Sequence, residues 1–187
     1  MVERASDAIR ARGAGVSLDE LAVACGVSKP VLYDLFGDKV GLADAVAAEL
    51  ARRVTQRVGA ALAQPGATVA SAVAALVDEM VGLLETEHEL YRFLVATIRG
   101  GDHGFFDSAL VRVVRERGVD LLAALGAGGP EVAGDRLRVL IDGAFGFLFF
   151  AVESWQADPR VGRDELVATL GGVLTRVIET ELGPAPT

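Results

Sequence analysis

The stretch that most constrains the fold begins at Ser17, where the sequence predicts two short helices joined by a tight turn. Ser17 and Glu20 have the S-x-x-E spacing in which each residue satisfies a free amide at a helix N-terminus. Gly26 is expected to end this first helix, because glycine adopts a left-handed cap conformation at little cost. Ser28 and Pro30 then begin a second helix, since serine caps a helix start and proline is tolerated in the first turn. This order of signals predicts a helix-turn-helix, whose second helix is shaped to enter a DNA groove.

Apolar residues in both helices are spaced so that each helix buries one face. In the first helix they recur at i, i+3, i+4 and i+7, which is the period of a helical stripe. The stripe comprises Leu18, Leu21, Ala22 and Cys25, and the inward face expected of the second helix comprises Val31, Leu32, Leu35 and Phe36. Because Cys25 is the only cysteine, the chain has no internal disulfide, as is typical of a reducing compartment. We expect Cys25 to pack in the core rather than to sense redox, because nothing near it in the sequence would lower its pKa.

The segment from Leu21 to Lys39 resembles the DNA-binding signature of the TetR family of transcriptional regulators. Its sequence, LAVACGVSKPVLYDLFGDK, resembles the family pattern, which is roughly I-A-x-x-A-G-V-S-x-G-T-[LI]-Y-x-[HY]-F-x-x-K-E-x-L, and the resemblance extends over about residues 17–50. The chain departs from this pattern at Pro30 and Val31 (usually Gly-Thr), at Leu35 (an aromatic residue or His) and at Val40 (an acid). The missing threonine hydroxyl removes one expected phosphate contact.

This resemblance implies an all-α protein of about nine helices. It places an N-terminal three-helix DNA-binding domain at residues 1–46 and a helical ligand-binding and dimerisation bundle at residues 47–187. The implied function is that of a homodimeric repressor, which a small apolar ligand releases from a palindromic operator in double-stranded DNA. The alternative is an architectural DNA-binding protein on the same fold, with no small-molecule effector.

The chain's only two lysines, Lys29 and Lys39, both stand at expected helix starts. A cation there opposes the helix dipole, whereas a DNA phosphate would reverse the cost. We expect Lys39 to contact phosphate and Lys29 to contact a guanine edge or a phosphate; alternatively, both are solvated surface lysines. The Tyr33 hydroxyl either donates to the DNA backbone or packs between helices. The residues expected at the DNA are Ser17, Ser28, Lys29, Pro30, Val31, Tyr33, Asp34 and Lys39.

The charge is divided unevenly along the chain. Residues 1–60 hold eight basic and eight acidic residues, so the formal net charge of -8 belongs wholly to residues 61–187. An acidic body opposes non-specific binding to DNA, and local contacts must therefore supply the affinity. The longest apolar run, residues 141–152, is too short and too interrupted to cross a membrane, and no basic segment followed by an apolar stretch opens the chain. We therefore expect a cytoplasmic protein with no membrane partner.

Helical periodicity continues through the rest of the chain, with breaks at glycine and proline clusters. The helices expected outside the helix-turn-helix span residues 2–11, 39–63, 68–86, 87–99, 105–125, 131–156 and 163–182.

The last two of these helices are apolar over much of their surface, and their glycines would allow close helix approach. The resemblance implies that they pair with their copies in a four-helix dimer interface, and the alternative is ordinary core packing. The expected interface residues are Leu137, Ile141, Leu148, Leu166, Leu170, Val173, Leu174 and Val177.

Aromatic residues and methionine are concentrated in the central body, as would suit an apolar or aromatic effector. The resemblance implies a ligand cavity among these helices, although for each residue taken singly the pattern favours simple core packing. The expected pocket residues are Met80, Leu84, Tyr91, Phe105, Phe106, Phe145 and Phe149.

The sequence argues against an enzyme, because it contains no phosphate-binding loop, no Rossmann glycine pattern and no recognised nucleophile motif. Glu85 and His88 alone have a helical ligand spacing, and such charges usually form a solvated face. We therefore expect no metal and no cofactor.

Overall fold

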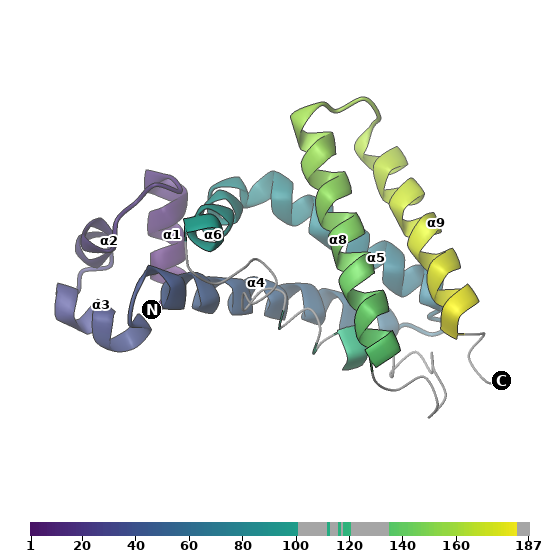
Figure 1. Ribbon diagram of the computed structural model, residues 1–187, viewed down its shortest axis with the longest axis horizontal. Helices are drawn as coiled ribbons and strands as arrows, with labels where there is room; N and C mark the ends of the chain where they lie inside the picture. Colours follow the sequence, from purple (N-terminus) through teal and green to yellow (C-terminus); the bar gives the residue numbers. More distant parts are fainter. Residues whose placement is uncertain (101–111, 113–115, 117, 121–134, 183–187) are drawn as a thin grey trace. The chain divides into compact units, whose positions relative to one another are not determined.

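The computed structural model describes residues 1–100, 112, 116, 118–120 and 135–182. Over these residues it contains helices and no strand, which confirms the expected all-α class (Figure 1). The helices are α1 (Val2–Arg12), α2 (Leu18–Ala24), α3 (Lys29–Phe36), α4 (Lys39–Leu62), α5 (Val69–Thr86), α6 (His88–Gly100), α8 (Asp135–Ala157) and α9 (Arg163–Leu182). None of the helices in this part of the chain combines the length and apolar character that a membrane span requires. The helix expected at residues 105–125 lies largely outside the described residues.

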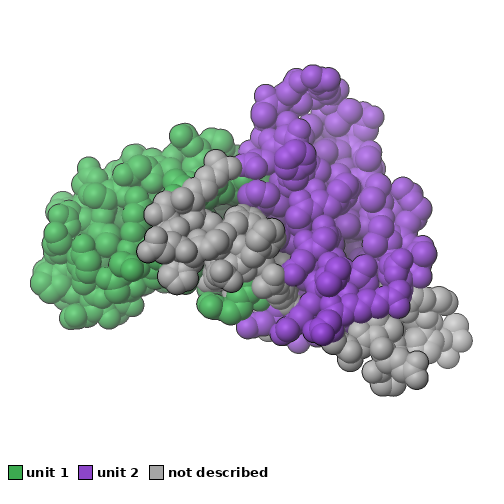
Figure 2. Space-filling model, in the orientation of Figure 1, with its two compact units in different colours: residues 1–52, 83–113 green, residues 53–82, 114–187 purple. Residues whose placement is uncertain are grey.

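The chain divides into two compact units, shown in green and purple in Figure 2. Unit 1 comprises residues 1–52 and 83–113, and unit 2 comprises residues 53–82 and 114–187. Helices α4 and α5 each contribute to both units. The boundary expected at residue 46, between a DNA-binding domain and a ligand-binding domain, stays a prediction.

Unit 1 is built around a core to which the helix-turn-helix, α1, the start of α4 and the first turns of α6 all contribute. Burying a large apolar side chain contributes about 1.5–3 kcal/mol, so these contacts are the main source of stability for such short helices. The largest side chains that are almost fully buried in this core are Ile9, Leu21, Leu32, Leu42, Leu90 and Phe93. Helix α6 is therefore part of the core that supports α2 and α3.

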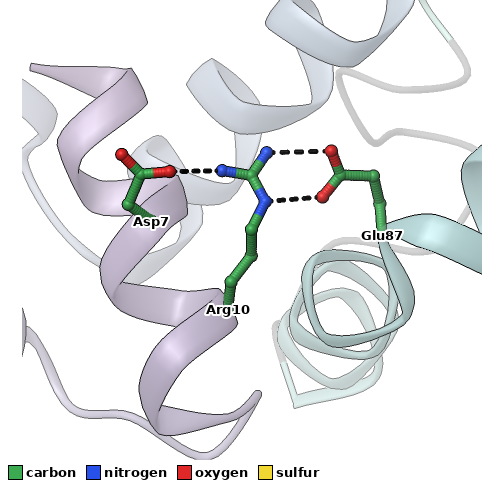
Figure 3. A network of polar contacts seen from close by, with 3 residues as sticks. All are labelled: Asp7, Arg10 and Glu87. Atoms are coloured by element: carbon green, nitrogen blue, oxygen red, sulfur yellow. Dashed lines mark hydrogen bonds and ion pairs between the residues drawn. The ribbon is translucent and has the colours of Figure 1, made fainter.

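A group of polar contacts joins α1 to the beginning of α6 (Figure 3). Arg10 donates from Nε to Glu87 Oε2 at 2.6 Å and from Nη2 to Glu87 Oε1 at 2.9 Å. Its third nitrogen, Nη1, donates to Asp7 Oδ1 at 2.6 Å. Just beyond α1, the backbone amide of Ala14 donates to Glu89 Oε2 at 2.8 Å. The start of α6 is thus fixed to α1 by directed bonds as well as by apolar packing.

In unit 2, α8 and α9 form an antiparallel pair. Arg136 near the start of α8 pairs with Glu181 near the end of α9 at 2.6 Å. At the other end, the Trp155 indole donates to the Val161 carbonyl at 2.8 Å. The buried faces of the two helices comprise Ile141, Phe145, Leu148 and Val152 on α8, and Leu166, Leu170 and Leu174 on α9.

Candidate nucleic-acid interface

The start of α2 has the capping box that its sequence predicts. The Ser17 amide donates to Glu20 Oε2 at 2.9 Å, and the Glu20 amide donates to Ser17 Oγ at 3.3 Å. The Ser17 hydroxyl also donates to Glu20 Oε2, at 2.7 Å, and the bonds from the Ser17 amide and hydroxyl to this carboxylate lower the pKa of the Glu20 carboxyl. At the other end of the helix, Gly26 has a φ of 66°, so the glycine predicted there is used for its left-handed conformation. The turn between the two helices is therefore fixed locally at both ends.

Helix α3 has Ser28 at its N-cap as predicted and begins at Lys29, but the Ser28 side chain makes no capping hydrogen bond. Pro30, the second residue of the helix, has no amide to donate, and the amide of the third residue, Val31, does not form the cap bond either. The helix start is instead closed by the backbone, where the Leu32 amide donates to the Ser28 carbonyl at 3.3 Å.

The exposed face of α3 differs from the sequence expectation. Leu32 is buried at 1% relative exposure and Phe36 packs against the same core, but Val31 and Leu35 are exposed at 42% and 54%. The prediction that Val31 and Leu35 face inward is therefore wrong. Residues four apart share a helix face, so the pairs 31/35 and 32/36 lie on neighbouring stripes of α3. Only the 32/36 stripe packs into the core of unit 1. The other stripe, together with the exposed Tyr33, faces solvent.

Lys29, the first residue of α3, is paired with Asp19 in the first turn of α2. Its ammonium nitrogen lies 2.7 Å from Asp19 Oδ1 and 2.8 Å from Oδ2, and 5.9 Å from the centroid of the Tyr33 ring. The hydrogen bond and charge of Asp19 raise the pKa of Lys29, so it remains cationic at neutral pH. More than half of each side chain is exposed to solvent.

Lys39, the first residue of α4, directs its ammonium group toward the interior of unit 1. The group donates to the carbonyl of Val16 at 3.0 Å and lies 5.1 Å from the centroid of the Phe93 ring. It thereby connects the start of α4 to the loop before α2 and to α6. These contacts of Lys39 could not be predicted from the sequence, because Val16 and Phe93 are distant from Lys39 in the chain.

The turn between α3 and α4 leaves no room for a side chain at one position. Asp38 caps α4, with its Oδ1 accepting from the Gly41 amide at 2.8 Å. A Cβ on Gly41 would overlap the carbonyl oxygen of Phe36. Glycine at 41 therefore permits the close turn that positions α3 against α4.

The described residues expected to line a ligand pocket are distributed over both units. In unit 1, Leu84 is buried and Tyr91 is half-buried. In unit 2, Met80 is half-buried, and the rings of Phe145 and Phe149 lie 5.8 Å apart. Phe105 and Phe106 lie outside the described residues. A groove of about 490 Å³ does open along α5 and α9 of unit 2, but none of these residues lines it.

The expected dimer residues fall on both faces of α8 and α9. Within unit 2, Leu137 and Val173 are half-buried and Val177 is exposed. The buried ones are Ile141, Leu148, Leu166, Leu170 and Leu174. The exposed face of α8 instead carries Val139, Phe147 and Phe150, which the sequence analysis did not select. Their spacing of i, i+8 and i+11 places them on one side of a helix, and this signal could have identified them.

Where the structure describes the chain, no group of three or more His, Cys, Asp or Glu residues is arranged to hold a metal ion. Cys25 is buried in unit 1, and burial raises the pKa of its thiol.

Comparison with known proteins places these features among bacterial regulators. Residues 2–46 match the family described as bacterial regulatory proteins, tetR family. An uncharacterized HTH-type transcriptional regulator from Mycobacterium tuberculosis is 30% identical over 181 residues, covering 89% of this chain and 70% of the relative.

Solved structures of low sequence identity share the fold. A TetR-family regulator from Streptomyces coelicolor has a TM-score of 0.70 at 21% identity, covering 97% of this chain and 98% of the other. The fatty acid degradation regulator FadR from Bacillus halodurans has a TM-score of 0.68 at 18% identity, covering 93% and 95%. The TetR-family repressor AlkX from a Dietzia strain, implicated in biodegradation of n-alkanes, has a TM-score of 0.67 at 18% identity, covering 96% and 95%.

Proposed function

The chain belongs to the TetR family of bacterial regulatory proteins, and from this premise we propose that it is a homodimeric repressor released from a palindromic operator by a small apolar ligand. The observation that carries the DNA-binding part of the proposal is the solvent-facing side of α3. Helix α3 exposes three large side chains, those of Val31, Tyr33 and Leu35, next to a lysine. A cluster of exposed apolar surface of this kind is typical of an interaction site. The same set is well suited to a major groove, which presents both hydrogen-bonding edges and thymine methyl groups.

Several exposed residues of α3 and of the turn before it have a proposed role at the DNA. Lys29 at the first position donates to a guanine edge, and Val31 lies against a thymine methyl. The hydroxyl groups of Tyr33 and Ser28 donate to phosphates. The Ser17 hydroxyl at the start of α2 donates to Glu20 Oε2 at 2.7 Å, so it reaches a phosphate only by giving up that bond. Pro30 and Asp34 lie on the same short helix and border these contacts.

Lys39 serves the interface mainly by position. Its ammonium group holds the start of α4 to Val16 and Phe93, and an ammonium has three donors. We propose that a remaining donor and the N-terminus of α4 share one phosphate.

The proposed dimer interface uses the exposed faces of α8 and α9. Val139, Phe147 and Phe150 give α8 an apolar face, and the exposed Gly143 and Gly146 beside them would let a partner helix approach closely. Val177 extends the apolar surface on α9. The buried residues of both helices then act as the support of this interface, not as its contacts.

The proposed effector is apolar because the candidate pocket residues are mainly aromatic and aliphatic. Tyr91 belongs to α6, whose first turns are part of the core of unit 1. A ligand that displaces α6 would therefore act on the core that supports α3, through the Arg10–Glu87 and Ala14–Glu89 bonds. Because the two recognition helices of a dimer must meet successive grooves about 34–36 Å apart, a small displacement is enough to lower operator affinity.

Selection of bound sequences from a random duplex library tests this function. We expect a palindromic motif with half-sites one helical turn apart. An architectural protein would instead enrich no motif. To search for the effector, we would first test fatty acids and n-alkanes in a thermal-shift screen. These compounds appear in the names of two proteins that share this fold. A ligand that raises the melting temperature should also lower affinity for the selected operator, and one that leaves that affinity unchanged would contradict the release mechanism.

A further inference from the structure

The ion pair between Asp19 and Lys29 couples a charged residue of α2 to the proposed reading position of α3. Asp19 approaches the Lys29 ammonium with both carboxylate oxygens, at 2.7 and 2.8 Å, although the two residues are ten positions apart. The same ammonium group lies over the aromatic ring of Tyr33, 5.9 Å from its centroid. Asp19 and Tyr33 together therefore define where the lysine charge is held.

The Asp19–Lys29 ion pair is exposed to solvent, so another anion can compete with Asp19 for the lysine. Side-chain exposures are 55% for Lys29 and 61% for Asp19. Solvent-exposed ion pairs of this kind are weak, and a DNA phosphate is a direct competitor for the lysine. Asp19 is also in the first turn of α2, where an acidic side chain interacts favourably with the helix dipole.

A lysine at a DNA surface can act in two ways. Bound to a phosphate, it adds affinity for every sequence alike, because phosphates occur at every step. Bound to the O6 and N7 atoms of guanine, it adds selectivity. A neighbouring carboxylate alters this choice. A phosphate that binds Lys29 beside Asp19 brings two anions together, whereas the guanine edge is uncharged and can accept from a donor that the pair leaves available.

We propose that Asp19 is a specificity-determining residue, which positions the Lys29 ammonium for a guanine edge and withholds it from phosphates. This inference rests on the proposed binding of α3 to DNA. It assigns Asp19 a positioning role, with Lys29 making the contact.

The test is Asp19→Asn, which removes the charge and keeps the size of the side chain. Affinities are measured for the selected operator and for a scrambled duplex of equal length, over a series of salt concentrations. We expect affinity for the scrambled duplex to rise roughly two- to thirty-fold in a dimer, which is the range of two exposed ion pairs. The salt slope on that duplex should steepen by up to about two, from about 0.9 for each added phosphate contact. Operator affinity should rise less, so that the ratio of the two affinities falls.

Three further variants separate this role from a general charge effect. Glu3→Gln is the matched control, because Glu3 is likewise an exposed acid in the first turn of a helix of unit 1. It should leave the affinity ratio unchanged. Asp19→Glu keeps the charge and should preserve selectivity. In a Lys29→Ala background, Asp19→Asn should have no further effect, because the residue acts through the lysine.

The inference is overturned if Asp19→Asn leaves the affinity ratio unchanged, if Glu3→Gln lowers it equally, or if the effect persists without Lys29. Each of these outcomes assumes that the wild-type protein selects a motif. A wild-type protein that selects no motif would instead contradict the proposed function, so the two failures are distinguishable.

Discussion

Arg10 and Glu87, which are 77 positions apart in the sequence, form a bidentate ion pair with N–O distances of 2.6 and 2.9 Å. Only 14% of the Glu87 side chain and 32% of the Arg10 side chain are exposed. Charge-assisted bonds with parallel donors are both strong and directional. Hydrogen bonding to Glu87 accordingly raises the pKa of Arg10. The pair thus fixes the first turn of α6 to α1.

The first prediction follows from this pair. Glu87→Gln should lower the free energy of unfolding by about 1–3 kcal/mol, because a hydrogen bond to a charged group is lost in a partly buried place. It should also weaken operator binding, since α6 supports the core under α3. Chemical denaturation and fluorescence anisotropy measure the two effects. Asp7→Asn is the control, because it removes a more exposed carboxylate from the same guanidinium and should cost less than about 1 kcal/mol. Equal losses in the two variants would show that Glu87 has no special role.

The second prediction concerns two glycines in α4. Gly41→Ala should destabilise the protein by about 3 kcal/mol or more, because the added Cβ overlaps the Phe36 carbonyl oxygen and forces the turn between α3 and α4 to open. Gly59→Ala in the same helix is the matched control, since no atom lies within 4 Å of its Cβ position. It should stabilise the protein by about 0.8–1 kcal/mol through helix propensity alone. Thermal melts of both variants check these signs, and a neutral Gly41→Ala would contradict the tight turn.

Much of unit 1 could be predicted because its signals are local. The capping box of Ser17 and Glu20, the left-handed Gly26 and the Asp38 cap each depend on residues within a few positions. The choice between neighbouring helix stripes was harder. Val31/Leu35 and Leu32/Phe36 have the same spacing and similar hydrophobicity, so only the tertiary core decides which stripe is buried.

The contacts between distant segments could not be predicted, because no sequence pattern specifies them. The Lys39 contacts with Val16 and Phe93 and the Arg10–Glu87 pair arise when α6 packs beside α1 and the start of α4. Helices α8 and α9 pose a related problem. They are apolar on more than one side, and hydrophobicity alone does not distinguish the side that packs within the unit from the side that faces solvent.

The third prediction tests that exposed side. Phe150→Arg should convert the proposed dimer to a monomer, because a charge would be buried without a partner in an apolar interface. Val23→Arg is the control, since Val23 on α2 has the same relative exposure of 74% as Phe150. It should leave the mass of the particle unchanged. Light scattering over a range of protein concentrations measures both masses. A monomeric wild type, or a dimeric Phe150→Arg with unchanged dissociation, would contradict the proposed interface.

The last prediction separates two roles for Lys39. Lys39→Met removes the ammonium group and keeps an apolar side chain of similar length near the Phe93 ring. Without DNA, the free energy of unfolding should fall by about 1 kcal/mol, because the hydrogen bond to Val16 and the contact with the ring are lost. With DNA, affinity should decrease for all duplexes alike, and the salt slope should flatten by about two in a dimer if each protomer loses one phosphate contact. Denaturation and salt titrations of the same preparation measure the two effects separately. Unchanged stability would contradict the inward contacts of Lys39. A loss of stability with an unchanged salt slope would show that Lys39 positions α4 without touching phosphate, and a change in base preference would transfer to Lys39 the reading role proposed for Lys29.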